Sequence, residues 1–262
     1  MTHRSIIHSP PFALTMSTIA ILGATGTIGS ALSRHLVATT NQVLLLGRDP
    51  DKLAALSAEL DQPFAVVDFS VSQSLEHALV EHSEHCGGYQ GLVNCIGSML
   101  LKPAHSTSDA EFRETLETNL FTAFSTIRTG GKLLRKSGGS IVLFASAAAE
   151  IGIPNHEAIA AAKGGVIGMA RSAAATYASH KIRVNVISPG LVQTRLSRQI
   201  WDTPTAAAAS TEMHALGRLG ETQDVVSLAA WLLDPQNSWI TGQVIGLDGG
   251  LSSLLPRRRQ ST

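Results

Sequence analysis

Short apolar runs alternate with longer helical stretches along the whole chain, and this alternation leaves few folds open to it. Each run is apolar throughout its length rather than at every second position, which is typical of strands buried on both faces of a sheet. The runs are Ile19–Leu22, Val43–Leu46, Ala65–Val67, Gly91–Val93, Ile141–Phe144, Val184–Ile187 and Val244–Leu247. The main helical stretches are Ser30–Ala38, Asp51–Leu60, Ser74–His82, Asp109–Ser137 and Ala158–Ser179. The sequence therefore predicts an α/β fold, with a doubly wound parallel sheet of about seven strands and helices on both faces.

Length and the two chain ends define one predicted domain. A chain of 262 residues suits a single α/β domain, and no internal repeat or low-complexity linker indicates a boundary. We expect this domain to span residues 17–255. Residues 1–16 are predicted to be a disordered leader, because their apolar stretch is too short and too interrupted for a secretory signal or a membrane span. Residues 256–262, which include three consecutive arginines, are predicted to be a basic flexible tail.

Charge and composition narrow the range of partners. The formal net charge is zero, so no basic field indicates nucleic-acid binding. The two cysteines do not make a disulfide framework, and they favour a reducing, cytoplasmic location. We expect no membrane partner, because no apolar stretch is long enough to span one. Hydrophobic residues make up 44% of the chain and charged residues only 15%. We therefore expect apolar surface to be buried between subunits of a homo-oligomer.

A glycine-rich turn joins the first predicted strand to a helix. One glycine allows a tight turn, another allows close approach of a pyrophosphate, and a third allows close packing of helix on strand. The N-terminus of the following helix presents its N–H groups to the anion. Because the turn lies between a strand and a helix, it predicts a dinucleotide site in a Rossmann-type domain rather than an ordinary glycine turn. The candidate residues are Gly23, Thr25, Gly26, Thr27, Ile28 and Gly29.

The end of the second predicted strand bears on which dinucleotide is bound. An acidic side chain at this place binds the ribose 2′-hydroxyl of NAD, whereas an arginine accommodates the 2′-phosphate of NADP. Here Gly47 is followed by Arg48 and then by Asp49. The guanidinium of Arg48 favours NADP(H), and Asp49 keeps NAD(H) as the alternative. Arg48 could also be an ordinary solvated turn residue.

Taken together, these segments resemble the short-chain dehydrogenase/reductase family from about Ser17 to Leu251. The resemblance implies that Asp68 and Phe69 contact the adenine and that Asn94 and Gly97 lie under its ring. It also implies that Pro189, Gly190 and Thr194 belong to a segment that closes over the nicotinamide. Two C-terminal groups match the signature of the family, Thr241-Gly242 and Asp248-Gly249-Gly250.

The catalytic residues of the family are matched except at one position. Asn119 resembles the asparagine that holds a water in the proton relay, and Ser146 resembles the catalytic serine. Lys163 resembles the lysine that holds the ribose and lowers the pKa of a tyrosine one turn earlier. That tyrosine position is occupied by Ile159. The only tyrosines, Tyr89 and Tyr177, are too far away in the sequence to replace it.

Isoleucine has no proton to exchange with a substrate, so another group must supply it. His156 lies three positions before Ile159 and would share its helix face, which makes it a candidate general acid. Water or the substrate itself are further sources. The ordinary interpretation is that His156 is an exposed first-turn residue and that Asn155 caps the helix. Ser146 could polarise a carbonyl oxygen or simply bond to local backbone.

Two further groups of residues have weaker functional interpretations. His82, His85 and Cys86 include zinc-ligand types, but no second cluster completes a site, and we interpret them as a polar helix end. Cys95 is interpreted as a small buried hydrophobe. The segment Leu196–Thr211, which relatives use as a lid, would form a largely apolar pocket with Met99, Leu100, Ile151, Ile153 and Leu191.

The leading functional hypothesis is an NADP(H)-dependent oxidoreductase that acts on a carbonyl or alcohol of an apolar small molecule. The cofactor would carry the hydride, and the protein would bind, orient and supply the proton. A non-redox enzyme such as an isomerase, cyclase or dehydratase is the second hypothesis, and a catalytically silent cofactor-binding subunit is the third. The resemblance implies a tetramer or dimer, with apolar faces supplied by the helices at 109–137 and 158–179.

Overall fold

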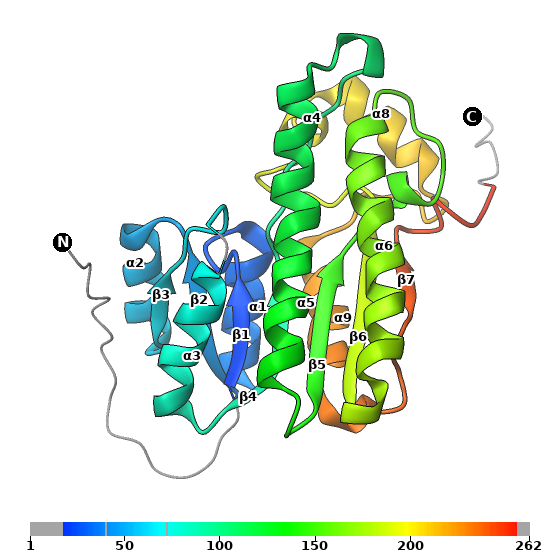
Figure 1. The fold of residues 1–262 in the computed structure, drawn as a ribbon. Helices are drawn as coiled ribbons and strands as arrows, with labels where there is room; N and C mark the ends of the chain where they lie inside the picture. The colour runs from blue at the N-terminus through cyan, green and yellow to red at the C-terminus, as the bar shows by residue number, and fades with distance from the viewer. Residues whose placement is uncertain (1–17, 40, 72, 256–262) are drawn as a thin grey trace.

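Seven parallel strands form one sheet in the order β3-β2-β1-β4-β5-β6-β7 (Figure 1). The computed structural model describes residues 18–39, 41–71 and 73–255, so the predicted leader and the tail at 256–262 lie outside the described residues. The strands are β1 Thr18–Leu22, β2 Gln42–Gly47, β3 Phe64–Val66, β4 Tyr89–Asn94, β5 Gly139–Phe144, β6 Ile182–Pro189 and β7 Val244–Leu247. The order reverses between β1 and β4, as in a doubly wound sheet. The predicted fold class is confirmed.

Helices cover both faces of this sheet. One face carries α1 Thr27–Ala38, α2 Pro50–Leu60 and α9 Thr222–Leu233, and the other carries α3 Ser74–Cys86, α5 Thr122–Leu133 and α6 Glu157–Tyr177. Three helices occupy connections beyond the carboxyl ends of the strands: α4 Asp109–Leu116, α7 Arg198–Trp201 and α8 Pro204–Met213 (Figure 1). None of the helices in the described part of the chain has the length and apolar character needed to cross a bilayer.

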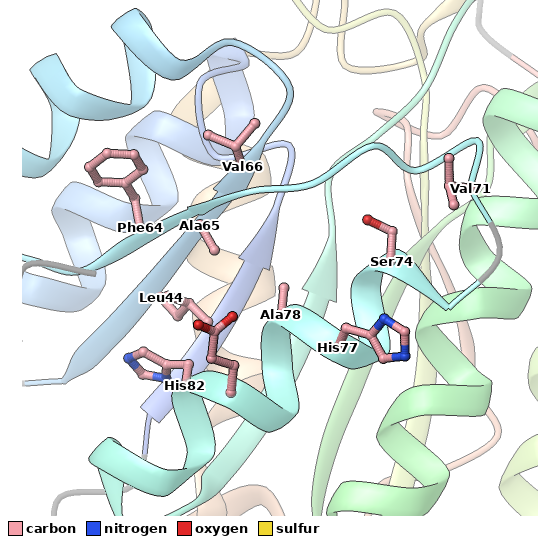
Figure 2. Close-up of a pocket in the computed structure, with 10 residues that line it drawn as sticks. Leu44, Phe64, Ala65, Val66, Val71, Ser74, His77, Ala78 and His82 are labelled. Atoms are coloured by element: carbon pink, nitrogen blue, oxygen red, sulfur yellow. The ribbon is translucent and has the colours of Figure 1, made fainter. Parts of the chain in front are cut away.

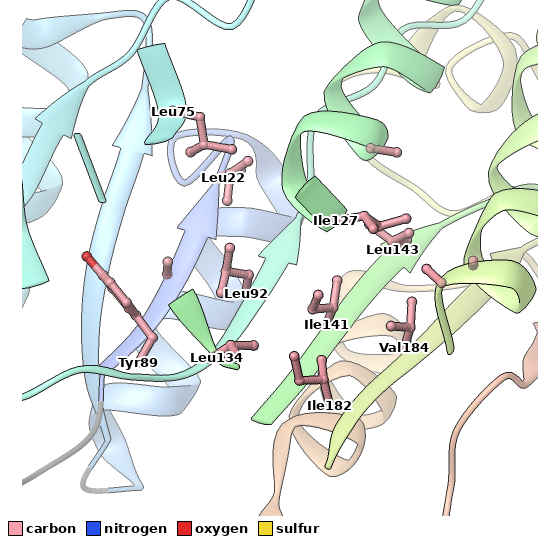
Figure 3. Close-up of a cluster of buried hydrophobic side chains, with 14 of the residues drawn as sticks. Leu22, Leu75, Tyr89, Leu92, Ile127, Leu134, Ile141, Leu143, Ile182 and Val184 are labelled. Atoms are coloured by element: carbon pink, nitrogen blue, oxygen red, sulfur yellow. The ribbon is translucent and has the colours of Figure 1, made fainter. Parts of the chain in front are cut away.

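Alternate side chains of each central strand enter two separate cores. In β1, Ala20 and Leu22 pack toward α3, α5 and α6, whereas Ile19 and Ile21 pack toward α1, α2 and α9. Figure 3 shows the first of these cores, with Leu22, Leu92 and Ile141 from neighbouring strands beside Ile127 of α5. Burial on both faces explains why these strands are apolar throughout.

The two edge strands depart from the prediction of full burial. Val66 in β3 is 48% exposed, and the residues of β7 are half-buried or exposed. An edge strand has a neighbour on one side only, so the covering helices leave part of it open to solvent. The runs at Ala65–Val67 and Val244–Leu247 were correctly predicted as strands, but the expected burial on both faces is wrong for them.

The single helix predicted over 109–137 is divided into three parts. A π-helical segment at Glu117–Phe121 separates α4 from α5, and α5 ends at Leu133. Side chains compete here for the carbonyls of the preceding turn: the Asn119 amide donates to the Thr115 oxygen at 2.9 Å, and the Thr122 hydroxyl donates to the Thr118 oxygen at 2.7 Å. Such competition favours local departures from the α-helix.

Candidate active site

A cavity of about 610 Å³ opens at the carboxyl ends of the strands, where the strand order reverses. Ligands of open α/β sheets bind at this kind of place. Its lining comes from segments that follow five strands: Gly26, Thr27 and Ile28 after β1, Arg48 after β2, residues 95–99 after β4, residues 144–146 at the end of β5, and residues 189–192 and 194–197 after β6. Asn119, Ile159 and Lys163 complete it from the helices. Most of the predicted site residues are therefore brought together.

The glycine turn has the geometry that its spacing predicted. Gly23 has a φ of +73°, and a Cβ there would lie 3.2 Å from the backbone nitrogen of Ile96. A Cβ at Gly29 would lie 2.3 Å from the Gly23 oxygen, so only glycine lets α1 pack this closely on the turn. Gly26 is the N-cap of α1 and supplies no side-chain hydrogen bond, so the first N–H groups of the helix are left for another acceptor. Thr25 lies outside the lining that the described residues form.

Arg48 and Asp49 have different surroundings. Arg48 is exposed and lines the cavity. The Asp49 carboxylate caps α2 by accepting a hydrogen bond from the Lys52 backbone N–H at 3.2 Å, and it also pairs with the Lys52 ammonium. These contacts hold the pKa of Asp49 below its usual value. The Asp49 carboxylate is thus engaged by contacts within the protein, whereas the Arg48 guanidinium faces the cavity.

Lys163 lies on α6 at the floor of the cavity and is only 7% exposed. Its ammonium donates to the Phe144 carbonyl oxygen at 2.9 Å, which ties α6 to the end of β5. Burial disfavours the charged form and lowers the pKa of Lys163 to about 8. An ammonium has three N–H donors, and among the described residues Phe144 takes one of them. The other two are available to a bound molecule.

Asn119 lies in the π-helical segment and is almost fully buried. Its amide oxygen accepts from the Ser98 N–H at 3.1 Å, and its amide nitrogen donates to the Ser98 hydroxyl and to the Thr115 oxygen, each at 2.9 Å. A Cβ added at Gly97 would lie 3.2 Å from the Asn119 oxygen and 3.8 Å from the Lys163 nitrogen. Asn119, Gly97 and Lys163 therefore lie close together. Ser98 was not predicted, and nothing in its sequence context indicates its contact with Asn119.

Ser146 lies directly after β5 and lines the cavity. Its hydroxyl oxygen accepts a hydrogen bond from the Ala148 N–H at 3.2 Å. The hydroxyl is therefore bonded to local backbone, which was one of the two interpretations of this serine. That contact uses the oxygen as acceptor only. The hydroxyl proton has no acceptor among the described residues and remains able to donate into the cavity.

Ile159 lies on the cavity wall one turn before Lys163 and is 5% exposed. The spacing of four residues places the two side chains on the same face of α6. Ser146, Ile159 and Lys163 thus line one cavity from two elements. No tyrosine is among the described residues that line it, because Tyr89 packs in the core and Tyr177 lies at the far end of α6.

His156 lies at the N-cap of α6, and its Nδ1 is 2.8 Å from the Pro154 carbonyl oxygen. It is not among the described residues that line the cavity. Asn155 does not cap the helix as expected, because it has a left-handed φ of +63° and precedes the N-cap. The cap position needs an extended or near-helical residue, and His156 provides it without a side-chain cap bond.

The segment after β6 closes one side of the cavity. Pro189, Gly190 and Thr194 line it as predicted, and the Arg195 N–H donates to the Thr27 hydroxyl at the start of α1 at 3.2 Å. Of the predicted apolar pocket, Met99, Leu191 and Leu196 line the cavity. Leu100, Ile151 and Ile153 are described but lie outside its lining.

The residues expected around the adenine are only partly at the cavity. Gly97 lines it, while Asp68, Phe69 and Asn94 lie outside its described lining. Asp68 accepts from the Ser70 N–H and hydroxyl, and Asn94 donates to the Thr122 hydroxyl at 3.2 Å. Cys95 lines the cavity, and burial raises the pKa of its thiol to about 12, in keeping with an unreactive apolar role.

A second cavity of about 310 Å³ lies between the edge strand β3 and α3 (Figure 2). Its walls combine Phe64 and Ala65 with His77 and His82. Buried His82 lies 3.2 Å from the Tyr89 hydroxyl through its Nδ1, so this helix end is packed rather than solvated. Among the described residues, no group of three or more His, Cys, Asp or Glu side chains could hold a metal ion.

Comparisons with known proteins agree with this geometry. A family model described as Enoyl-(Acyl carrier protein) reductase matches residues 23–252. A tropinone reductase homologue of Arabidopsis thaliana is 32% identical over 248 residues, which cover 92% of this chain and 94% of the relative. Galactitol 2-dehydrogenase (L-tagatose-forming) of Cereibacter sphaeroides is 29% identical, with 91% of this chain and 96% of the relative covered. The solved structure of a short-chain type dehydrogenase/reductase from Mycobacterium ulcerans matches with a TM-score of 0.87 and 28% identity, over 92% of this chain and 91% of that chain.

Proposed function

The chain belongs to the short-chain dehydrogenase/reductase family, and we propose that it is an NADP(H)-dependent oxidoreductase that interconverts a carbonyl and an alcohol on an apolar small molecule. The observation that carries the proposal is a single cavity that joins the open N-terminus of α1 to Ser146, Asn119 and Lys163. One end offers backbone N–H groups to phosphates, and the other offers polar side chains to a reacting oxygen. The relatives are named as reductases and dehydrogenases, which supports chemistry of this class.

The described residues fit a nicotinamide dinucleotide. The start of α1 has no side-chain cap, and Gly26 leaves its N–H groups accessible to an anion. Buried Lys163 keeps two N–H donors for hydroxyl groups such as those of a ribose. A bound nicotinamide would supply the hydride chemistry. The remaining work, which is to hold, orient and exchange a proton, falls to side chains of this chain.

NADP(H) is favoured over NAD(H) by the two residues that follow β2. The Arg48 guanidinium faces the cavity and offers a planar set of donors to a 2′-phosphate. The Asp49 carboxylate, which would bind a 2′-hydroxyl, is engaged by α2 and Lys52. An acidic side chain held in this way is poorly placed to bind a ribose.

Ile159 occupies the place of the family tyrosine in this proposal, so the site must take its proton from elsewhere. The titratable side chains in the described cavity lining are Arg48, Arg195, Cys95 and Lys163. Arginine does not deprotonate in proteins, and the pKa of Cys95 is raised to about 12. Lys163, with its pKa lowered to about 8, is the group whose proton affinity is matched to exchange near neutral pH.

We therefore assign proton donation to the Lys163 ammonium and polarisation of the substrate oxygen to the Ser146 hydroxyl. Asn119 fixes the loop around Ser98 and so shapes the wall beside the ammonium. His156 is the alternative donor, and it would have to act from outside the described lining. A reduction rate that falls as the pH rises through about 8 supports Lys163. A large loss of rate in His156→Ala would favour the histidine instead.

Cofactor titration is the first test of the proposed function. Purified protein is titrated with NADPH and with NADH while nicotinamide fluorescence is followed, and reduction is then assayed on a panel of apolar ketones and aldehydes. Tight binding of NADPH with turnover supports the proposal. Binding without turnover on any carbonyl would indicate a silent cofactor-binding subunit, and substrate conversion without net cofactor change would indicate a non-redox enzyme. If neither nucleotide binds at millimolar concentration, the oxidoreductase proposal is wrong.

We also propose that the protein is a homo-oligomer, a dimer or tetramer. Phe121 and Phe124, at the junction of the π-helical segment and α5, are 51% and 46% exposed, which is costly for aromatic rings in a monomer. The neighbouring face of α6 exposes small side chains such as Ala161 and Ala175, over which a second chain could pack closely. Sedimentation equilibrium measures the state directly, and a purely monomeric profile would contradict this proposal.

A further inference from the structure

Helix α8 has an unusual form of attachment to the domain. None of its residues is buried, and its N-cap Thr203 makes no side-chain cap hydrogen bond. A helix without a buried face gains little from packing, so other contacts must hold it in place. The residue that follows it, His214, is 4% exposed.

The His214 ring makes a hydrogen bond through each of its nitrogens. Nε2 lies 3.1 Å from the Leu191 backbone nitrogen, and Nδ1 lies 2.6 Å from the Ser210 carbonyl oxygen in the last turn of α8. A backbone N–H can only donate, so Nε2 must be the unprotonated acceptor. Nδ1 then carries the proton and donates to Ser210. The contacts thus define one neutral tautomer that joins the helix to the segment after β6.

The backbone around the ring is shaped to accept it. A Cβ at Gly190 would lie 2.5 Å from the His214 Nε2 and 3.0 Å from the Asp248 Cα. The surrounding backbone is fixed to the end of β7, because the Gly190 N–H donates to the Leu247 oxygen at 3.1 Å and the Leu216 N–H donates to the Gly249 oxygen at 3.0 Å. Gly190 therefore has a role besides lining the cavity: it leaves room for the imidazole.

The other helix of the same connection is attached to the same stretch of backbone. The Trp201 indole N–H of α7 donates to the Thr194 oxygen at 2.8 Å, and the buried Ser197 hydroxyl donates to the Val192 oxygen. Leu191, Val192 and Thr194 all line the cavity. Contacts from α7 and from His214 thus converge on one wall of the site.

We propose that His214 is a positioning residue, a hydrogen-bonded latch that couples α8 to the Gly190–Leu191 wall of the cavity. It touches neither substrate nor cofactor, and it acts by holding the segment 191–213 in the arrangement that completes the site. Its consequence for cofactor binding rests on the proposed function. The latch itself is a property of the free protein and can be measured without any ligand.

The test compares two substitutions, His214→Leu and His214→Gln. Leucine has a similar bulk to histidine but is apolar, so it removes both hydrogen bonds. Glutamine carries an acceptor and a donor on one amide and can engage both Leu191 and Ser210. The matched control is His82→Leu, which removes another buried histidine far from α8. Each protein is examined by hydrogen exchange with mass spectrometry, by NADPH titration and by thermal melting.

We expect His214→Leu to speed exchange of peptides within 191–213 by about 10-fold relative to the rest of the chain, because local opening is no longer opposed by two hydrogen bonds. The dissociation constant for NADPH should rise by about 3- to 10-fold as the competent arrangement becomes less populated. His214→Gln should restore most of both effects. His82→Leu should lower the melting temperature without changing the relative exchange of 191–213 or the dissociation constant for NADPH.

The proposal is overturned if His214→Leu lowers the melting temperature while exchange of 191–213 keeps its wild-type ratio to the core and NADPH affinity is unchanged. It is also overturned if glutamine behaves like leucine in both measurements. Should the leucine variant not fold, His214→Asn gives the same comparison, because its shorter amide cannot span both partners. If wild-type protein binds no NADPH, the proposed function fails, and the exchange data still decide whether the latch exists.

Discussion

The two ends of the candidate site differ in how strictly the fold constrains them. At the dinucleotide end, Gly23 and Gly29 leave no space for a side chain, and the backbone itself presents the binding groups. At the reaction end, Ile159 fills a place on the wall of the cavity, and its side chain is buried. A site whose binding groups belong to the backbone can be altered only with a loss of folding stability. A site whose reactive groups belong to side chains can lose one of them while the fold remains intact.

Introducing a tyrosine at the reaction end is expected to have the largest effect on this contrast. Ile159→Tyr would place a phenol one turn before Lys163, where the lysine can promote proton exchange. We expect the rate of carbonyl reduction to rise by about 10²- to 10⁴-fold, the usual contribution of a positioned general acid. Steady-state kinetics with NADPH on the most active carbonyl measures the change.

Ile159→Phe is the matched control, since it adds the ring without the hydroxyl. Equal rates in the phenylalanine and tyrosine proteins would show that ring packing, not proton donation, limits the reaction. A tyrosine protein no faster than the wild type would mean that the reaction is not limited by the lack of a phenol at position 159.

At the dinucleotide end, even the smallest side chain added to the glycine turn should weaken both cofactor binding and stability. Gly29→Ala places a Cβ 2.3 Å from the Gly23 oxygen, so α1 must shift away from the turn. We expect NADPH affinity to fall by about 100-fold or more and stability to fall by about 1–3 kcal/mol, as for other overpacked sites. Fluorescence titration and urea unfolding measure the two losses.

Gly152→Ala is the control for this substitution, because a Cβ at that position meets no atom within 4 Å. It should bind NADPH normally and change stability by less than about 0.5 kcal/mol. Normal NADPH binding by Gly29→Ala would remove the contrast between the two ends of the site.

Removal of the Arg48 guanidinium should have a smaller effect, which is confined to the preference for NADP over NAD. Arg48→Ala removes the guanidinium from the cavity and leaves Asp49 engaged by Lys52. We expect NADPH affinity to fall by about 10- to 100-fold, the value of a charge-assisted contact with phosphate, and NADH affinity to stay nearly constant. Parallel titrations give the ratio, and an equal loss for both nucleotides would assign Arg48 a role other than 2′-phosphate recognition.

Sequence patterns predicted what the backbone determines and missed what tertiary contacts determine. Each of the seven strands and the glycine turn followed from local periodicity and spacing, because buried parallel strands and tight turns tolerate few sequences. The π-helical segment around Asn119 did not, since it depends on side chains competing for carbonyls within one helix. The contacts of Ser98 with Asn119 and of His214 with Leu191 join residues more than twenty positions apart, and no local pattern marks them. The apolar pocket was only partly predicted, because Ile151 and Ile153 lie in a loop whose direction sequence does not fix.

The smallest expected effect concerns the stability cost of keeping Lys163 in the wall of the cavity. Its pKa is lowered from 10.5 in the open chain to about 8 by burial. Below pH 8 the lysine is protonated in both states, so the full cost of burying its charge is present. Between about pH 8 and 10.5 the unfolded chain binds more protons than the folded one, so this cost fades and stability rises with pH.

Lys163→Met should therefore be more stable than the wild type at pH 7, by about 1–3 kcal/mol less the loss of the hydrogen bond to Phe144. The advantage should shrink as the pH rises from 8 toward 10.5, and carbonyl reduction should be lost at every pH. Urea unfolding of both proteins across this range measures the difference, with Lys132→Met, which removes an exposed lysine paired with Glu76, as the control. A stability difference that does not change with pH would show that Lys163 has the same pKa in the folded and the unfolded chain. Burial of the lysine would then impose no charge-related cost on the fold, and only the dinucleotide end would be constrained by folding.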